Sequence, residues 1–184
     1  QSGDTPILKI SIHPIAHPEC RLPFVNVPTI FLEEQRCLAA MNISDEGRDS
    51  RIFLVNVDTL ESEFVSVPDA QWGPYGFVKG ADGRIYVGFF FGRIYSFDPV
   101  SKRFELKADP FANQTPDRLT WGGYASRAGR LYMGVYPTGE FTEYEIATGE
   151  FRTIAPLEGV PFGVYANQFV ELPDGRILVL LYGS

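Results

Sequence analysis

The chain has 184 residues, of which 45% are hydrophobic and 21% charged, and its formal net charge is −7. This apolar fraction is too high for a disordered chain, and the longest unbroken apolar run, Ile177 to Tyr182, is too short to cross a bilayer. An acidic chain without a basic run is also a poor binder of nucleic acid or of an anionic membrane. We therefore expect one soluble globular domain with neither nucleic acid nor a membrane as its partner.

The composition favours short strands joined by tight turns. The chain contains 15 Phe, 9 Tyr, 18 Gly and 14 Pro, and aromatic residues favour strands while Gly and Pro favour turns. No window of a dozen residues carries an apolar stripe at helical spacing. We predict an all-β protein.

One turn motif recurs along the chain. It stands at Ala81–Tyr86, Ala128–Tyr132 and Pro173–Leu178, and its glycines at positions 83, 129 and 175 are 46 residues apart in both cases. Glu34–Leu38 is a degenerate fourth copy. Such an internal period indicates one supersecondary unit that is repeated side by side.

Each copy of the turn has the same strands around it. A short apolar strand precedes the turn, a stronger one follows it (Ile85 to Phe89), a third strand alternates in polarity (Ile94 to Phe97), and a fourth begins at Phe104. Four antiparallel strands in about 46 residues, joined by Asp-Gly hairpins, describe one blade of a β-propeller. We predict a propeller with about four blade equivalents.

The blade boundaries follow from the repeat. We expect residues 1–28 to hold the outer strands of a terminal blade, 29–75, 76–121 and 122–167 to be repeats, and 168–184 to be an incomplete blade. Ile10 to Pro14 aligns with Tyr95 to Pro99 as a third strand, and Leu22 to Val27 is interpreted as a fourth. The chain is then either a closed four-bladed ring or part of a larger ring of roughly six to eight blades.

The motif Asp-Gly-Arg-Ile-Tyr-Val-Gly at 82–88, followed by Phe97-Asp98-Pro99 and a turn into Phe104, resembles propellers of the streptogramin-lyase, SMP-30 (gluconolactonase) and NHL-like kind. The resemblance implies the fold, but such propellers serve as lyases, lactonases and interaction platforms. The lactonases imply a divalent metal held by Glu, Asn and Asp, and we match no such set here. The lyases imply a catalytic His, and this chain has only His13 and His17.

Ligands usually bind at the face with the longer loops. In this repeat these are the blade connections Val67 to Gly76, Ala108 to Gly123 and Pro156 to Asn167, together with the turns between second and third strands. We call this end the loop face and the opposite end, with the Asp-Gly-Arg turns, the turn face. The candidate ligand-binding residues of the loop face are Trp72, Asn113, Asp117, Trp121 and Asn167, and the candidate catalytic residues are Tyr75, Tyr136, Tyr165 and Arg118.

Aromatic rings beside amides, one arginine and one carboxylate suit a carbohydrate or another small polar ligand, because a sugar face stacks on a ring while its hydroxyls need directional partners. If the protein is an enzyme, we favour a lyase over a lactonase, with a tyrosine as acid or base and Arg118 neutralising a carboxylate. The alternatives are a non-catalytic interaction domain, a domain that completes its ring with a further propeller segment or partner chain, and a metal-dependent lactonase. Packing of Trp72 and Trp121 between blades is the competing interpretation of these two rings.

Two further features bear on location and on structure. A chain that opens at Gln1 is typical of a mature secreted protein and also of a fragment, and we expect an extracellular or periplasmic location. Cys20 and Cys37 are too few for a disulfide scaffold, and a disulfide between them stays open. Cys37 falls in the slot of Ile85 and is interpreted as a small buried hydrophobe. Arg84, like Arg130 and Arg176, follows a hairpin turn and is interpreted as a rim residue.

Overall fold

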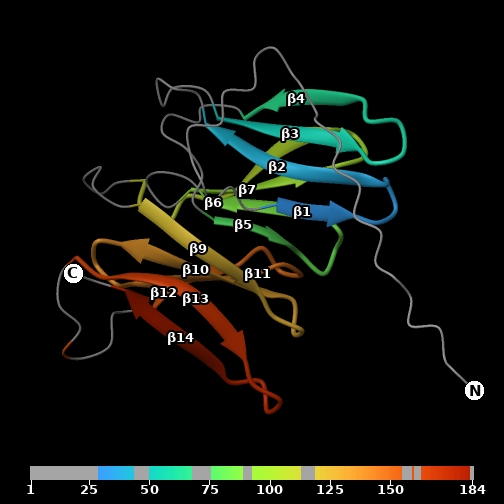
Figure 1. Ribbon diagram of the computed structural model, residues 1–184. Helices are drawn as coiled ribbons and strands as arrows, with labels where there is room; N and C mark the ends of the chain where they lie inside the picture. The colour runs from blue at the N-terminus through green and yellow to red at the C-terminus, as the bar shows by residue number, and fades with distance from the viewer. Residues whose placement is uncertain are drawn as a thin grey trace, which may run out of the picture.

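A computed structural model describes residues 29–43, 50–67, 76–88, 93–112, 119–154, 159 and 163–182. The described residues form fourteen strands and no helix (Figure 1), which confirms the all-β prediction. No helix of this part of the chain is therefore long and apolar enough to cross a membrane.

The strands form four antiparallel sheets in chain order. Sheet 1 contains β1 (Thr29–Leu32), β2 (Cys37–Ile43), β3 (Ser50–Asn56) and β4 (Ser62–Ser66), and sheet 2 contains β5 (Gly76–Lys79), β6 (Ile85–Gly88), β7 (Ile94–Asp98) and β8 (Arg103–Ala108). Sheet 3 contains β9 (Leu119–Ala125), β10 (Arg130–Tyr136), β11 (Phe141–Glu145) and β12 (Phe151–Ile154), and sheet 4 contains β13 (Tyr165–Glu171) and β14 (Ile177–Tyr182).

The four sheets follow one another as the blades of a propeller do. Their first strands β1, β5, β9 and β13 contact each other in that order, and Figure 1 shows the sheets fanned out from sheet 1 at one end to sheet 4 at the other. Sheets 1 to 3 are complete four-stranded meanders, whereas sheet 4 has two strands in the described part of the chain. The strands expected at Ile10 to Pro14 and Leu22 to Val27 lie outside the described residues.

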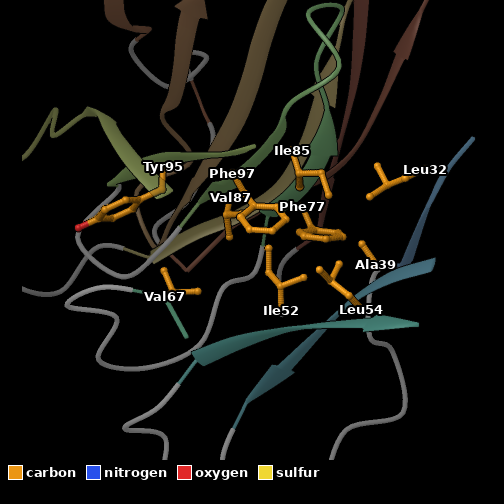
Figure 2. Close-up of a cluster of buried hydrophobic side chains, with 10 residues drawn as sticks. All are labelled: Leu32, Ala39, Ile52, Leu54, Val67, Phe77, Ile85, Val87, Tyr95 and Phe97. Carbon is orange, nitrogen blue, oxygen red and sulfur yellow. The ribbon is translucent and has the colours of Figure 1, made fainter. Parts of the chain in front are cut away.

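Side chains that alternate along the strands pack each sheet onto the next. Between sheets 1 and 2, for example, Ile52 and Leu54 meet Phe77, Val87 and Phe97 (Figure 2), all of them buried. A second cluster, with Tyr86, Leu131, Met133 and Tyr144, lies between sheets 2 and 3, and a third, with Phe141, Ala166 and Phe169, lies between sheets 3 and 4.

The alignment of the first repeat copy is wrong by one residue. Gly83, Gly129 and Gly175 occupy the turn position with φ of 79°, 79° and 84°, and the residue with positive φ in the first turn is Arg36, at 51°. Leu38 rather than Cys37 therefore takes the slot of Ile85, since a slip of one residue exchanges the two faces of a strand. Cys37 remains half-buried against the cluster between sheets 1 and 2, where burial raises the pKa of its free thiol. Cys20 lies outside the described residues.

The arginines of the turn motif make ion pairs at the blade surface, as expected for rim residues. Arg84 pairs with Glu105 at 3.1 Å, Arg130 with Glu145 at 2.8 Å, and Arg176 with Asp174 at 2.8 Å. Such pairs between exposed side chains contribute little stability, typically about 0–1 kcal/mol each.

Glu143 on β11 differs from the exposed partners of these ion pairs, because its side chain is only 11% exposed. Arg152 binds both carboxylate oxygens of Glu143. Its Nε donates to Oε1 at 2.9 Å and its Nη2 donates to Oε2 at 3.1 Å. Burial alone would raise the pKa of Glu143, but the hydrogen bonds and charge of Arg152, with help from Tyr132 and Arg130, lower it below the ordinary value. This carboxylate therefore stabilises the fold in its ionised form.

Replacing Glu143 by Gln is expected to lower the free energy of unfolding by about 1–3 kcal/mol at pH 7, because charge-assisted hydrogen bonds are lost. A depressed folded-state pKa gives stability that is present above the unfolded-state pKa and lost as the pH falls through the folded-state pKa. The difference between wild type and variant should therefore shrink as the pH is lowered below about 4, as measured by urea unfolding. Glu150→Gln, in an exposed turn, is the control, and a difference that does not depend on pH would contradict the assignment.

Gly80 sits where no side chain fits. A Cβ there would lie 2.6 Å from Cε2 of Tyr86 and 2.7 Å from Oδ1 of Asp82, and Tyr86 is only 1% exposed and donates a hydrogen bond to Asp82. We expect Gly80→Ala to cost about 1–3 kcal/mol through overpacking, measured by thermal unfolding. The neighbouring exposed substitution Ala81→Ser should change the stability by less than about 0.5 kcal/mol; equal effects of both substitutions would show that the clash is relieved.

Candidate functional site

All nine candidate site residues were expected at the loop face, and most of them lie outside the described residues. Trp72, Tyr75, Asn113, Asp117 and Arg118 fall in segments that the structure does not describe. The backbone is described for Trp121, Tyr165 and Asn167, and the side chain is described for Tyr136, which is half-buried.

The register of sheet 3 brings two of these residues to the same end of neighbouring strands. Trp121 on β9 is opposite Gly134 on β10, and Tyr136 ends β10 opposite Leu119. The first residues of β9 and the last residues of β10 thus lie side by side at the loop face.

The turn after β10 connects the loop-face end of sheet 3 to sheet 4. Thr138 forms a parallel β-bridge with Val164, the residue before Tyr165, and the Gly163 N–H donates to the Pro137 carbonyl at 2.9 Å. Within the turn, the Thr138 hydroxyl donates to Glu140 Oε2 at 2.8 Å. The backbones at Trp121, Tyr136 and Tyr165 therefore converge at one end of β9, β10 and β13.

Two inner strands carry a bulge in this region. In sheet 3 the pairing with β10 jumps over Gly122 and Gly123, and in sheet 4 the pairing with β14 jumps over Asn167. Bulges are frequent beside binding sites because they redirect side chains. The bulge at Asn167 lies near the loop-face start of β13, and the bulge at Gly122 and Gly123 lies in the middle of β9.

Three of the candidate residues are equivalent by the repeat. Tyr75, Trp121 and Asn167 are 46 residues apart, and Tyr75 immediately precedes β5, which begins at Gly76. The chain thus places one candidate at the loop-face end of each of three successive inner strands. The equivalence was present in the sequence and follows from the same period as the turn motif.

The described loop face also contains an ion pair that the sequence analysis missed. Arg93, just before β7, donates from Nε to Asp109 Oδ2 at 3.0 Å, just after β8. The other oxygen of Asp109, Oδ1, is buried and has no hydrogen-bond partner among the described residues. A buried acceptor without a donor is costly.

Groups with clearly shifted pKa values also occur at the turn face. Glu171 accepts from the Arg127 N–H at 2.9 Å and from the Tyr124 hydroxyl at 3.3 Å. The Arg127 backbone hydrogen bond, with the Arg127 charge, lowers the pKa of Glu171, while burial and Glu171 raise the pKa of Tyr124. These contacts connect the turns of sheets 3 and 4, so we interpret their role as structural.

A cavity of about 460 Å³ opens between sheets 1 and 2. Its lining includes Leu32, Cys37, Leu54 and Val100, and Lys102 Nζ meets Glu63 Oε1 at its edge at 2.6 Å. The turns that border it belong to the turn face. Three or more His, Cys, Asp or Glu side chains do not gather into a metal site anywhere in the described residues, and Asp117 lies outside them.

No protein-family model and no curated protein matches the chain. Solved structures do match it. Virginiamycin B lyase from Staphylococcus aureus is 10% identical with a TM-score of 0.65, over 86% of this chain and 50% of the lyase. The extracellular domain of the B. thetaiotaomicron one-component system BT4673 is 15% identical with a TM-score of 0.64, over 90% of this chain and 21% of that one.

A third structure, described as a gluconolactonase, is 14% identical with a TM-score of 0.59, over 82% of this chain and 53% of its own. This chain thus spans about half the length of the lyase and gluconolactonase chains and about a fifth of the BT4673 extracellular-domain chain. At these identities the likeness concerns the fold. It confirms that the chain has the β-propeller fold of the streptogramin-lyase and gluconolactonase kind and that it corresponds to part of those larger propellers.

Proposed function

We propose that this chain is part of an extracellular propeller whose loop face binds a carbohydrate or a related small polar ligand. The observation that carries the proposal is the convergence at the loop face: Tyr136 and the backbones at Trp121 and Tyr165 come from three neighbouring strands to one place. A ligand above the inner strands would meet all three.

The chemistry of the loop face suits such a ligand. Aromatic rings offer apolar faces for stacking against the C–H face of a sugar. The described loop face also carries the polar pair of Arg93 and Asp109, and the sequence adds Asn113, Asp117 and Arg118 to its loops. Directional polar groups beside apolar rings are the usual composition of a small-ligand site.

The extracellular location rests on the neighbours in fold. Two of the matching structures are of the extracellular domain of one protein, BT4673. A propeller that binds a ligand outside the cell is consistent with these structural matches.

Binding is tested by calorimetry with a panel of neutral and uronate-containing oligosaccharides as probes. Tyr136→Leu should weaken binding of the best probe about tenfold, because the ring that would stack on the sugar is lost. Phe151→Leu, at an exposed aromatic residue that begins β12 at the turn face, is the matched control and should leave the affinity unchanged. Absence of binding to every probe, or equal loss in both variants, would contradict the proposal.

Lyase chemistry at the same face is a second candidate, favoured by the approach of two tyrosine positions across the Thr138–Val164 bridge and by the fold shared with a lyase. In such a reaction one tyrosine would take the proton from the carbon next to a carboxylate, and Arg118 would neutralise that carboxylate. The C–H electron pair would form a C=C bond while the glycosidic oxygen on the next carbon leaves and is protonated by a tyrosine hydroxyl.

Turnover of uronate-containing oligosaccharides is followed by the appearance of the unsaturated product. Tyr136→Phe and Tyr165→Phe remove a proton-transfer group without removing the ring, so one of them should lower kcat about a hundredfold while the affinity changes little. Retained turnover in both variants would exclude the tyrosines as acid or base and leave the binding proposal intact.

A further inference from the structure

The cavity at the turn face lies between two complete four-stranded sheets, sheets 1 and 2. Its volume of about 460 Å³ falls within the range of small-ligand pockets, roughly 300–1,000 Å³. Sheet 1 forms one wall, and the turn between β7 and β8, with Val100 and Lys102, forms the other. All residues that line the cavity belong to the described part of the chain.

The repeat explains why this space is open over sheet 1. Because of the shift by one residue in the first copy, Cys37 takes the slot that Arg84 has in sheet 2. The Arg84 side chain extends across its own sheet, where Nη1 donates to Ser96 Oγ at 3.3 Å and to Glu105 Oε2 at 3.1 Å. The short thiol side chain of Cys37 leaves the equivalent space over sheet 1 unfilled, and the cavity opens there.

A second large side chain is absent from this face of sheet 1, and its loss is compensated. Ala39 takes the slot of Tyr86, whose ring lies over Gly80 in sheet 2. Leu32 takes the slot of Gly80 and is buried there, 1% exposed. Among the described residues of sheet 1, the missing arginine has no such replacement.

The carboxylate that would receive this arginine is nevertheless present. Glu63 on β4 is equivalent to Glu105 on β8, because each is paired with the same position of the third strand in its sheet. Lys102 reaches Glu63 from the opposite wall, and its Nζ donates to Oε1 at 2.6 Å. Sheet 1 thus keeps the acceptor for a cation and lacks the arginine that supplies the cation in sheet 2.

The charges at the cavity favour a further cation. Two carboxylates, of Glu61 and Glu63, line it together with one cation, Lys102, which leaves one negative charge unbalanced. Beside them the wall is apolar and includes the buried side chains of Leu32 and Leu54 (Figure 2). An apolar wall with carboxylates at its edge suits an alkyl arm with a cationic end. The net charge of the whole chain, −7, also favours the approach of a cation.

We propose that this cavity binds a small alkylguanidinium cation in the space that corresponds to the Arg84 side chain of sheet 2. The planar guanidinium group would donate to the Glu63 carboxylate, as Arg84 donates to Glu105. The alkyl arm would cover Leu54 and the Cys37 side chain, as an arginine stem covers apolar surface. The site is at the turn face, so it is independent of the ligand proposed for the loop face.

A pair of ligands that differ only in charge tests the proposal. n-Butylguanidinium is the probe, and n-butylurea, its neutral isostere, is the control ligand. Calorimetric titration of the full chain should show saturable binding of the cation and at least about tenfold weaker binding of the urea, because the charge-assisted hydrogen bond is lost. Equal binding of the two ligands, or binding of neither, overturns the proposal.

The carboxylate is tested by substitution in the same titration. Glu63→Gln should weaken binding of n-butylguanidinium about tenfold, because the ligand loses its charged partner. Glu105→Gln, at the equivalent carboxylate that Arg84 already occupies, is the matched control and should leave the affinity unchanged. Equal affinities of wild type and Glu63→Gln would show that the cation binds elsewhere.

The space itself is tested at position 37. Cys37→Arg restores the residue type of the other copies and should lower the affinity for n-butylguanidinium at least a hundredfold, because its own guanidinium fills the cavity. Cys37→Met is a second filling variant with an adaptable, uncharged side chain and should also block binding. Cys37→Ala keeps the space open and should retain the affinity within about twofold, with thermal unfolding reporting that each variant is folded. Binding retained in both filling variants, or lost in Cys37→Ala, would place the ligand outside this cavity.

Discussion

The structure depends on the face-to-face packing of successive sheets. Every strand alternates its side chains between two neighbours, so a second strand sends Ile85 towards the preceding sheet and Tyr86 towards the following one. Burying such a side chain contributes about 1.5–3 kcal/mol, and each sheet makes this gain twice only when it lies between two others. Sheets in the middle of the stack are therefore more stable than sheets at its ends. A sheet with an uncovered face lacks half of this burial.

The same constraint explains why the fold could be predicted from the sequence. The turn glycines need a positive φ, which glycine adopts without steric cost, and the residues after them must alternate to fill two interfaces. Both demands recur once per blade and leave a period of 46 residues in the sequence. The strands Ile94 to Phe97 and those beginning at Phe104 and Phe151 were predicted from this period, and the structure contains them as parts of β7, β8 and β12.

The first copy shows where such an argument fails. Its turn has no glycine, and Arg36 takes the left-handed conformation while its guanidinium binds the Asp58 carboxylate at 2.8 and 3.1 Å. An alignment by residue type matched Arg36 to Arg84 and exchanged the faces of Cys37 and Leu38. The pair of Arg93 and Asp109 was hidden for a different reason, since it forms across the irregular pairing at the start of β7, and no sequence period marks a contact between two loop residues. The candidate residues on the inner strands were found as aromatic and amide residues of long loops, and their shared place in the repeat was available but not used.

The candidate site and the ring are linked by this geometry. Tyr75, Trp121 and Asn167 each come from one inner strand at the same position of the repeat, so a central site at the loop face gains one such residue for each blade. Their identities differ, from phenol to indole to amide. Scaffold positions such as those of Ile85 and Leu131 stay apolar, because their side chains pack between blades. A ligand bound at the centre would therefore contact a different side chain from each blade, although the blades share one backbone structure. All of these side chains surround the ligand only in a closed ring.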